Sequence, residues 1–336
     1  MSQYTLATPV VPEDYKYTPE QCDIENKAAL VTFRDKRRVW LSWLNTDEHH
    51  AIWQVISSMV WHDVYFRTLA ELADENPDSG IHNSLVSEAI VTGYFATQVL
   101  SIRRLMDTRD DVISLPRLLK ELRRNLRLFT RENFVAFDGL PYDYEAAQQR
   151  VMLRHLAQGG GPFWGEQSGA DAHIPAARAH KQFDRLTGVR PENRRRDDRL
   201  PKRIIDTLDN WLKENVIDEI VKRSHTFLAH AAGPTAPNKN DIAAAAPTVD
   251  KITTSIKCFV RVADAVTGFI LFESGRGMLV PVPQFNQFEK LENSLMPSDR
   301  HALHREQWDK LTEERNAYLK GTESALISGH KAKIGD

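Results

Sequence analysis

The chain has 336 residues, of which 41 % are hydrophobic and 27 % are charged. This composition excludes a wholly disordered chain, and the length predicts one large domain or two fused lobes. The formal net charge of −2 excludes a whole-protein attraction to nucleic acid, so any such binding must come from local patches of charge.

The N-terminal segment 1–20 is expected to be extended. It starts with no basic cluster and no apolar run, so no signal peptide is expected. No stretch reaches about 18 uninterrupted apolar residues, which predicts that no segment spans a membrane. The two cysteines, Cys22 and Cys258, are far apart and fit no metal or redox spacing. We therefore expect a cytoplasmic protein with reduced thiols, no bound metal and no cofactor.

Helical periodicity dominates the chain, and no segment shows convincing strand alternation. The predicted fold class is therefore all-α, a helical bundle with long inserted loops. Ser114 is expected to cap a helix whose first turn accommodates Pro116, because a first turn does not use that backbone N–H. The predicted helices cover 21–44, 47–76, 82–107, 114–131, 142–158, 201–232, 248–273, 284–294 and 298–320.

Two segments interrupt this pattern. The first, 159–200, is rich in glycine and then in arginine, and it predicts a surface excursion with one short helix near 176–186. The second, 233–247, contains three prolines and ends the preceding helix. We expect the helical groups on both sides to pack into a single all-helical domain over 1–336.

Local positive charge is concentrated in two stretches. Between Ser101 and Glu132 nine Arg or Lys residues face five Asp or Glu residues, and the stretch 190–203 is also basic. A solvated helix face explains such surpluses more often than a nucleic-acid interface does.

The segment "RSHTFLAHAAG", residues 223–233, places an arginine seven residues before a histidine. On one helix over 201–232, Arg223 and His230 would lie about 20° apart, on the same face as Leu212 and Ile220. Arg150 and His155 have a similar spacing, but they would lie about 140° apart. The first pair is therefore the one that could face a single target.

Two explanations remain open for Arg223 and His230. In the structural one, Glu219 pairs with Arg223, and His230 lies near a helix C-terminus that Gly233 ends. In the chemical one, the histidine transfers a proton near neutral pH while the arginine holds a phosphate of RNA, whose own 2′-hydroxyl is the nucleophile. A two-fold dimer would supply two such pairs to one cleft.

Other polar and aromatic groups favour ordinary structural roles. His301 and His304 are three residues apart, but no matching set of ligands accompanies them, so solvated side chains are expected. The aromatic-rich segment 53–66 has helical spacing typical of core packing, with a base-stacking surface as the alternative. No phosphate-binding glycine loop or serine-hydrolase motif is present in the sequence.

Two blocks resemble a known family. "KRSHTFLAHA" resembles the signature helix end of the HEPN superfamily, helical proteins found as RNase toxins and abortive-infection factors. "SIRRLMDTRDDVISLPRLLKEL", Ser101 to Leu122, resembles the corresponding segment of the HEPN branch tied to abortive infection by phage. The blocks occur in the order that this branch shows them, and together they cover about a tenth of the chain.

The resemblance implies a HEPN-like bundle that forms a homodimer and cleaves RNA without a metal. Arg223 would then hold the phosphate, and His230 would act as acid or base. Ser224 departs from the Asn, Asp or His that usually follows the motif arginine. Ser224 and Thr226, together with Arg104 and Asp107, would line the cleft, although Arg104 and Asp107 could equally pair with each other.

The expected function is thus a metal-independent endoribonuclease of a phage-defence or toxin–antitoxin system, with RNA as substrate and an antitoxin protein as a further partner. The alternative is a non-catalytic helical module with the same fold that binds RNA or another protein. In that case the arginine and the histidine would serve the dimer interface.

Overall fold

The structure, a computed structural model, describes residues 15–47, 50–159, 165–213, 215–224, 247–273, 278–280, 282–291, 293 and 300–317. Helices make up most of this part of the chain. It contains no β-strand, only an isolated antiparallel bridge between Thr130 and Arg199. The all-α prediction is therefore confirmed for these residues.

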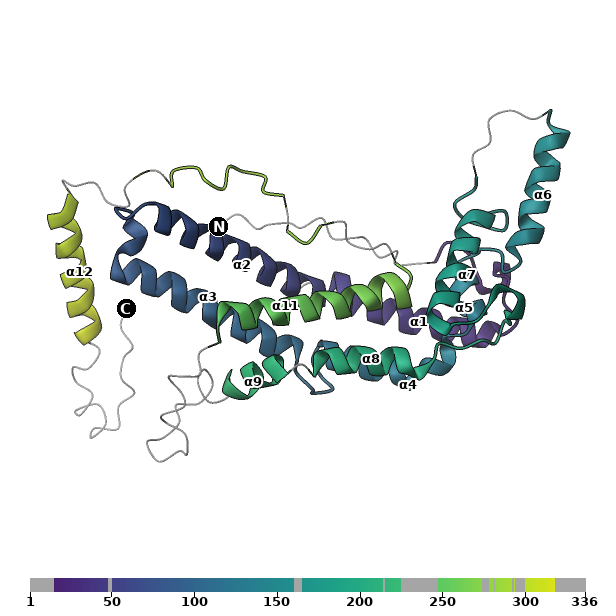
Figure 1. Cartoon of the computed structure of the whole chain (residues 1–336), viewed down its shortest axis with the longest axis horizontal. Coiled ribbons are helices and arrows are strands. Elements are labelled where there is room, and N and C mark those ends of the chain that lie inside the picture. The colour runs from purple at the N-terminus through teal and green to yellow at the C-terminus, as the bar shows by residue number, and fades with distance from the viewer. Residues whose placement is uncertain are drawn as a thin grey trace, which may run out of the picture. The chain divides into compact units, whose positions relative to one another are not determined.

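The α-helices are α1 (Lys27–Leu41), α2 (Ile52–Glu75), α3 (Ser84–Leu105), α4 (Leu115–Arg124), α5 (Arg131–Ala136), α6 (Tyr144–Ala157), α7 (His173–Thr187), α8 (Lys202–Leu212), α9 (Asn215–Ser224), α11 (Val249–Asp264) and α12 (His301–Asn316) (Figure 1). Two π-helical turns, Ser42–Thr46 and Ala265–Ile270, extend α1 and α11. Single 3₁₀ turns lie at Pro19–Gln21, Gly80–His82, Leu126–Leu128 and Pro191–Asn193.

The sequence predicts one domain, but the chain divides into two compact units. The larger unit consists of residues 1–71 and 88–282, and the smaller one of residues 72–87 and 283–336. In the smaller unit, α12 is exposed along its described side chains. The helix predicted over 284–294 is wrong for the residues described there, which form turns and bends.

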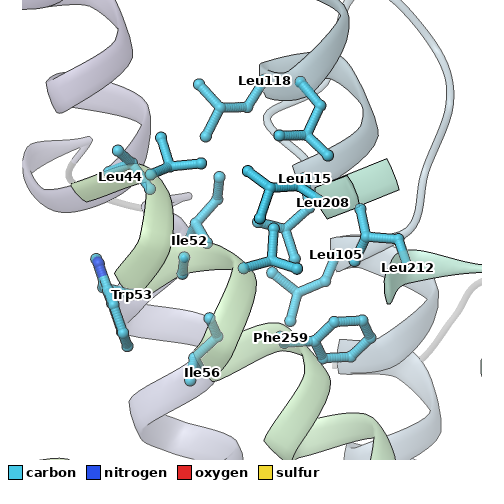
Figure 2. Packing of buried hydrophobic residues seen from close by; sticks show 14 of the residues in the cluster. Leu44, Ile52, Trp53, Ile56, Leu105, Leu115, Leu118, Leu208, Leu212 and Phe259 are labelled. Atoms are coloured by element: carbon cyan, nitrogen blue, oxygen red, sulfur yellow. The ribbon is translucent and has the colours of Figure 1, made fainter. Parts of the chain in front are cut away.

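The main core of the larger unit joins helices from both halves of the chain. Figure 2 shows Leu105 and Leu115 packed against Leu208, Leu212 and Phe259, which come from α8 and α11. Phe259 and Leu115 are completely buried. The segment predicted to hold a base-stacking surface or a core face contributes Trp53, Ile56 and Met59 to this cluster, so core packing accounts for those three side chains.

The start of α4 follows from its sequence. The side chain of Ser114 accepts a hydrogen bond from the backbone N–H of Arg117, and Pro116 lies in the first turn. Leu115, Leu118 and Leu122 recur at helical spacing and are completely buried. The predicted cap is confirmed, although the helix ends at Arg124 instead of 131.

Replacing Ser114 with alanine is expected to lower the free energy of unfolding by about 1–2 kcal/mol, because the α4 cap is lost. The hydroxyl also donates to the carbonyl of Asp107 at 2.5 Å, and that bond is lost with it. Urea unfolding measures the change. Thr32→Ala is the control, since the hydroxyl of exposed Thr32 donates back to the carbonyl of Ala28 in its own helix. Equal effects of the two changes would contradict the prediction.

The segment 159–200 differs from the predicted surface excursion. Its helix α7 is longer than expected, and Ala176, Ala179 and Phe183 are completely buried against Phe134 and Val135 of α5. The small side chains of Ala176 and Ala179 allow α7 to approach α5 closely. The described part of the segment therefore forms a second small core with α5 and α6.

The helix predicted over 201–232 is interrupted. α8 ends at Leu212, where Lys213 takes φ −88° and ψ 18°, and α9 begins at Asn215. Leu212 and Ile217 are both buried on either side of this break. The helical wheel that placed Leu212 and Arg223 on one face therefore does not apply across the break.

By length and composition alone, one helix of the described chain, α3, could cross a membrane. The sequence criterion missed it because Glu88, Thr92 and Gln98 interrupt its apolar run. A core helix of a soluble protein passes the same test. Gln98 donates to the carbonyl of Met59 at 2.9 Å, and Tyr94 donates to Asp63 at 2.6 Å, so this part of α3 packs against α2.

Candidate functional site

Of the two predicted catalytic residues, the structure describes Arg223 and leaves His230 outside the described residues. Arg223 and Ser224 are the last two residues of α9. His230 and Thr226 lie outside the described residues, so their relation to Arg223 remains a prediction. Glu219, the predicted partner of Arg223, accepts two hydrogen bonds from Lys251 of α11, both at 2.9 Å. This ion pair ties α9 to α11.

The other two predicted cleft residues each have a contact of their own. Asp107 accepts from the backbone N–H and the side chain of Arg109, with Oδ2 3.2 Å from the guanidinium Nη2. Burial acts to raise the pKa of Asp107, but the hydrogen bonds from Arg109 outweigh it and lower the pKa. Arg104 contacts the Nδ1 atom of His50. Sequence spacing could not identify His50, because it is 54 residues away in the chain.

Several of the basic residues between Ser101 and Glu132 form ion pairs, some with acids of the same segment and some with acids from elsewhere in the chain. Arg123 donates to Asp206 at 2.9 Å and also contacts Asp209, which joins α4 to α8. Lys36 of α1 and Arg124 meet Glu121 at 3.2 and 3.3 Å. These pairs favour the structural explanation of the surplus over a nucleic-acid surface.

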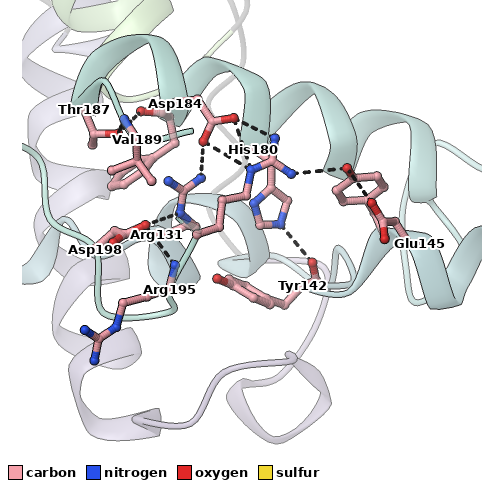
Figure 3. Close-up of polar contacts among 12 residues, drawn as sticks. Arg131, Tyr142, Glu145, His180, Asp184, Thr187, Val189, Arg195 and Asp198 are labelled. Carbon is pink, nitrogen blue, oxygen red and sulfur yellow. Dashed lines mark hydrogen bonds and ion pairs between the residues drawn. The ribbon is translucent and has the colours of Figure 1, made fainter. Parts of the chain in front are cut away.

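Residues of both basic stretches meet in a buried ionic network (Figure 3). Arg131 is completely buried, and its guanidinium donates to Asp184 at 2.6 Å and to Asp198 at 2.8 Å. Arg194 meets the other oxygen of Asp184 at 2.6 Å. Burial acts to raise the pKa of Asp184, but the hydrogen bonds from Arg194 and Arg131 outweigh it and hold the pKa below its usual value.

His180 lies beside this network. Its Nε2 atom is 2.8 Å from the carbonyl oxygen of Tyr142, so Nε2 must carry the proton and donate it (Figure 3). Its Nδ1 atom is buried and has no hydrogen-bond partner among the described residues. Burial lowers the pKa of His180 to about 4, and the charges of Arg194 and Arg131 add to this effect. The histidine is therefore neutral at physiological pH.

These groups hold the fold together and are poorly placed to react. Each carboxylate of the network forms an ion pair with an arginine, and the Nε2 atom of His180 donates to the carbonyl of Tyr142. The described residues contain no group of three or more His, Cys, Asp or Glu side chains that could hold a metal ion. His304, weighed as a ligand from its spacing, contacts Gln307 at 3.1 Å.

No protein-family model, no curated protein and no solved structure matches this chain. Its function must therefore be argued from its own residues.

The structure places the block Ser101–Leu122 against helices that precede the block 222–231, whose residues from 225 on lie outside the described residues. Leu105 and Leu115 of the first block pack against Leu208 and Leu212 of α8 (Figure 2). α9 follows α8, and its last three residues, Lys222 to Ser224, begin the block 222–231. The polar end of α3, with Arg104, thus belongs to the same packed group of helices as α9.

Proposed function

We propose that this chain is a HEPN-like helical protein of a phage-defence or toxin–antitoxin system, cytoplasmic, dimeric and acting as a metal-independent endoribonuclease. The observation that carries the proposal is the packing of α3 and α4 against α8, which leads into α9. Segments far apart in the sequence, Ser101–Leu122 and α9, which ends at Ser224, thereby belong to one packed group of helices.

In the proposed reaction the 2′-hydroxyl of RNA attacks the neighbouring phosphate. His230 accepts or donates the proton, and Arg223 donates hydrogen bonds to the phosphate as negative charge builds on it. Two chains related by a two-fold axis supply a second histidine, so that one histidine takes a proton from the nucleophile and the other gives a proton to the leaving oxygen. Ser224, Thr226, Arg104 and Asp107 contribute hydrogen-bonding groups at the cleft.

Purified protein is expected to cleave tRNA or total RNA in the presence of EDTA. His230→Ala is expected to slow cleavage by at least about a hundredfold, because a general acid–base group is lost. His304→Ala is the matched control, since the side chain of His304 is exposed on α12. Fragment analysis by gel electrophoresis measures the rates. The catalytic proposal is contradicted if the wild type and His230→Ala cleave RNA at the same rate, or if neither of them cleaves RNA.

A second candidate is a non-catalytic helical module that binds RNA or another protein. It is favoured by the ion pairs of Arg123 with Asp206 and of Lys251 with Glu219, in which basic side chains near both blocks hold helices together. In this case Arg223→Ala weakens the dimer or lowers the melting temperature, and the wild type cleaves no RNA. Light scattering for the dimer and thermal unfolding for the melting temperature, each on the wild type and on Arg223→Ala, together with the RNA cleavage assay, therefore separate the two candidates.

A further inference from the structure

A hollow of about 250 Å³ lies in the larger unit, beside α1. Its walls come from α1, from residues 137–138 after α5, from residues 272–273 after the π-helical turn, and from Tyr15. At about 30 Å³ for each liquid water, this space holds about eight waters. Its size therefore suits one small heteroaromatic ring system better than an extended ligand.

Three of the eight residues that line this hollow are aromatic, and four are charged. Tyr15, Phe137 and Phe272 line it. Guanidinium groups already stack on two of these rings: Arg38 lies 5.6 Å from the centroid of Tyr15 and Arg37 lies 4.3 Å from that of Phe137. Flat rings and guanidinium planes together form the kind of surface on which unpaired bases stack.

The polar groups of the hollow include two carboxylates that keep acceptor capacity. Asp138 accepts from the backbone N–H of Tyr17 at 3.1 Å through Oδ1, and Glu273 accepts from Arg37 at 2.8 Å through Oε2. Both side chains are 31 % exposed. Among the described residues, Oδ2 of Asp138 and Oε1 of Glu273 accept no hydrogen bond. Both oxygens can therefore accept from a ligand.

The donor at the hollow is Arg38. Its side chain is 44 % exposed, and it meets the exposed Asp35 at 3.4 Å, which is a weak surface pair. Arg37, by contrast, is buried and occupied by the carbonyl of Leu271 and by Glu273. Arg38 is therefore the guanidinium that a ligand can engage.

The charges of the lining residues balance, with Arg37 and Arg38 against Asp138 and Glu273. A phosphate or another anion would face two carboxylates and is disfavoured. A flat, neutral ring with N–H donors on one edge and acceptors on another satisfies all of these groups. Guanine has this pattern: its N1–H and amino group suit a carboxylate, and its O6 and N7 suit an arginine.

We propose that this hollow binds a single guanine base, packed against its aromatic side chains and read by Asp138 and Arg38. The base comes either from an unpaired position in RNA or from a free guanine nucleoside or nucleotide. The proposal goes beyond the proposed function and does not depend on Arg223 or His230, because the lining residues belong to other segments of the chain.

The backbone at the hollow is held in an uncommon conformation. Phe272 has φ +50°, in the left-handed region that non-glycine residues rarely adopt. It is fixed by its neighbours, since Arg37 binds the carbonyl of Leu271 and the backbone N–H of Glu273 donates to Thr267 at 3.0 Å. The π-helical turn Ala265–Ile270 leads into this corner. Such outliers cluster at ligand sites, where the surrounding contacts maintain them.

The test is titration calorimetry of the full chain with guanosine, adenosine, 5′-GMP and two uridine hexanucleotides that carry either one guanosine or one adenosine. Guanosine is expected to bind at least tenfold more tightly than adenosine. Asp138→Asn is expected to weaken guanosine binding at least tenfold while the melting temperature changes little, because Asn can still accept from Tyr17 and the ion pair of Asp138 with Arg34 is long, at 4.0 Å. Arg38→Met is expected to weaken it to a similar extent.

Asp110→Asn is the matched control, since it removes the same charge from a side chain that is 67 % exposed and pairs with Lys120. If the guanosine hexanucleotide binds more tightly than guanosine, and Asp138→Asn removes this binding, the base comes from RNA. If guanosine and 5′-GMP bind and the hexanucleotide does not, the ligand is a free nucleotide. Absence of saturable binding to millimolar concentration, or binding that neither variant changes, overturns the proposal. His230→Ala should bind guanosine like the wild type, so failure of the nuclease proposal is measured separately.

Discussion

Replacing Arg131 with methionine is expected to lower the free energy of unfolding by about 3–5 kcal/mol, because it breaks a buried ion pair by removing one partner. The guanidinium is completely buried and reaches Asp184 and Asp198 from α5. Asp184 would keep Arg194, but Asp198 would keep only the backbone N–H of Arg195. Urea unfolding followed by circular dichroism measures the loss.

Arg195→Met is the matched control for this change. Arg195 and its partner Asp197 are 76 % and 72 % exposed, so their interaction is screened by solvent. The control is expected to change the free energy of unfolding by less than about 0.5 kcal/mol. A loss for Arg131→Met no larger than that of the control would show that the network in Figure 3 does not hold α5 and α7 together.

The second large effect is a fall in stability between about pH 6.5 and pH 4, to which His180 contributes. The pKa of His180 is lowered to about 4 in the folded protein, from an ordinary value of 6.5. Protons therefore bind the unfolded chain first, and the contribution of His180 is complete above pH 6.5 and lost as the pH falls toward 4. A shift of this size corresponds to about 3 kcal/mol.

His180→Gln isolates this contribution, because glutamine can still donate to the carbonyl of Tyr142 but does not titrate. Between pH 7 and pH 4, the free energy of unfolding of the variant is expected to fall by about 3 kcal/mol less than that of the wild type. Urea unfolding at each pH measures it. Burial also lowers the pKa of His62, so the wild-type slope includes both histidines and only the difference reports His180. His304→Gln, at an exposed position, should follow the wild type. Parallel curves for the wild type and His180→Gln would show that this histidine is not neutral in the folded state.

These two predictions bear on function through the position of the network. Arg131 and His180 hold together the small core of α5, α6 and α7. Phe134 of this core also contacts Phe272, with ring centroids 5.3 Å apart, and Phe272 lines the proposed base site. Loss of the network should therefore weaken guanosine binding as well as stability, whereas Asp138→Asn should affect binding alone.

Several helices and their core faces could be predicted from the sequence because the cause was local. The cap of α4 needs only a serine three residues before Arg117, and its buried face needs only leucines at helical spacing. The break between α8 and α9 could not be predicted, because Lys213 is a good helix former and the apolar period continues on both sides. Leu212 and Ile217, on either side of the break, both belong to the main core.

The sequence by itself determined an all-helical chain with a cap at Ser114, and it directed attention to Arg223 and His230 through their spacing and family resemblance. Only the tertiary structure decided that Arg131 is a buried ion-pair partner, that the 159–200 segment contributes α7 to a core, and that Arg38 and Asp138 line one hollow. The physical reason is the range of the interactions. Helix capping and periodicity act within a few residues, whereas an ion pair or a binding site joins residues separated by up to hundreds of positions, such as Arg37 and Glu273.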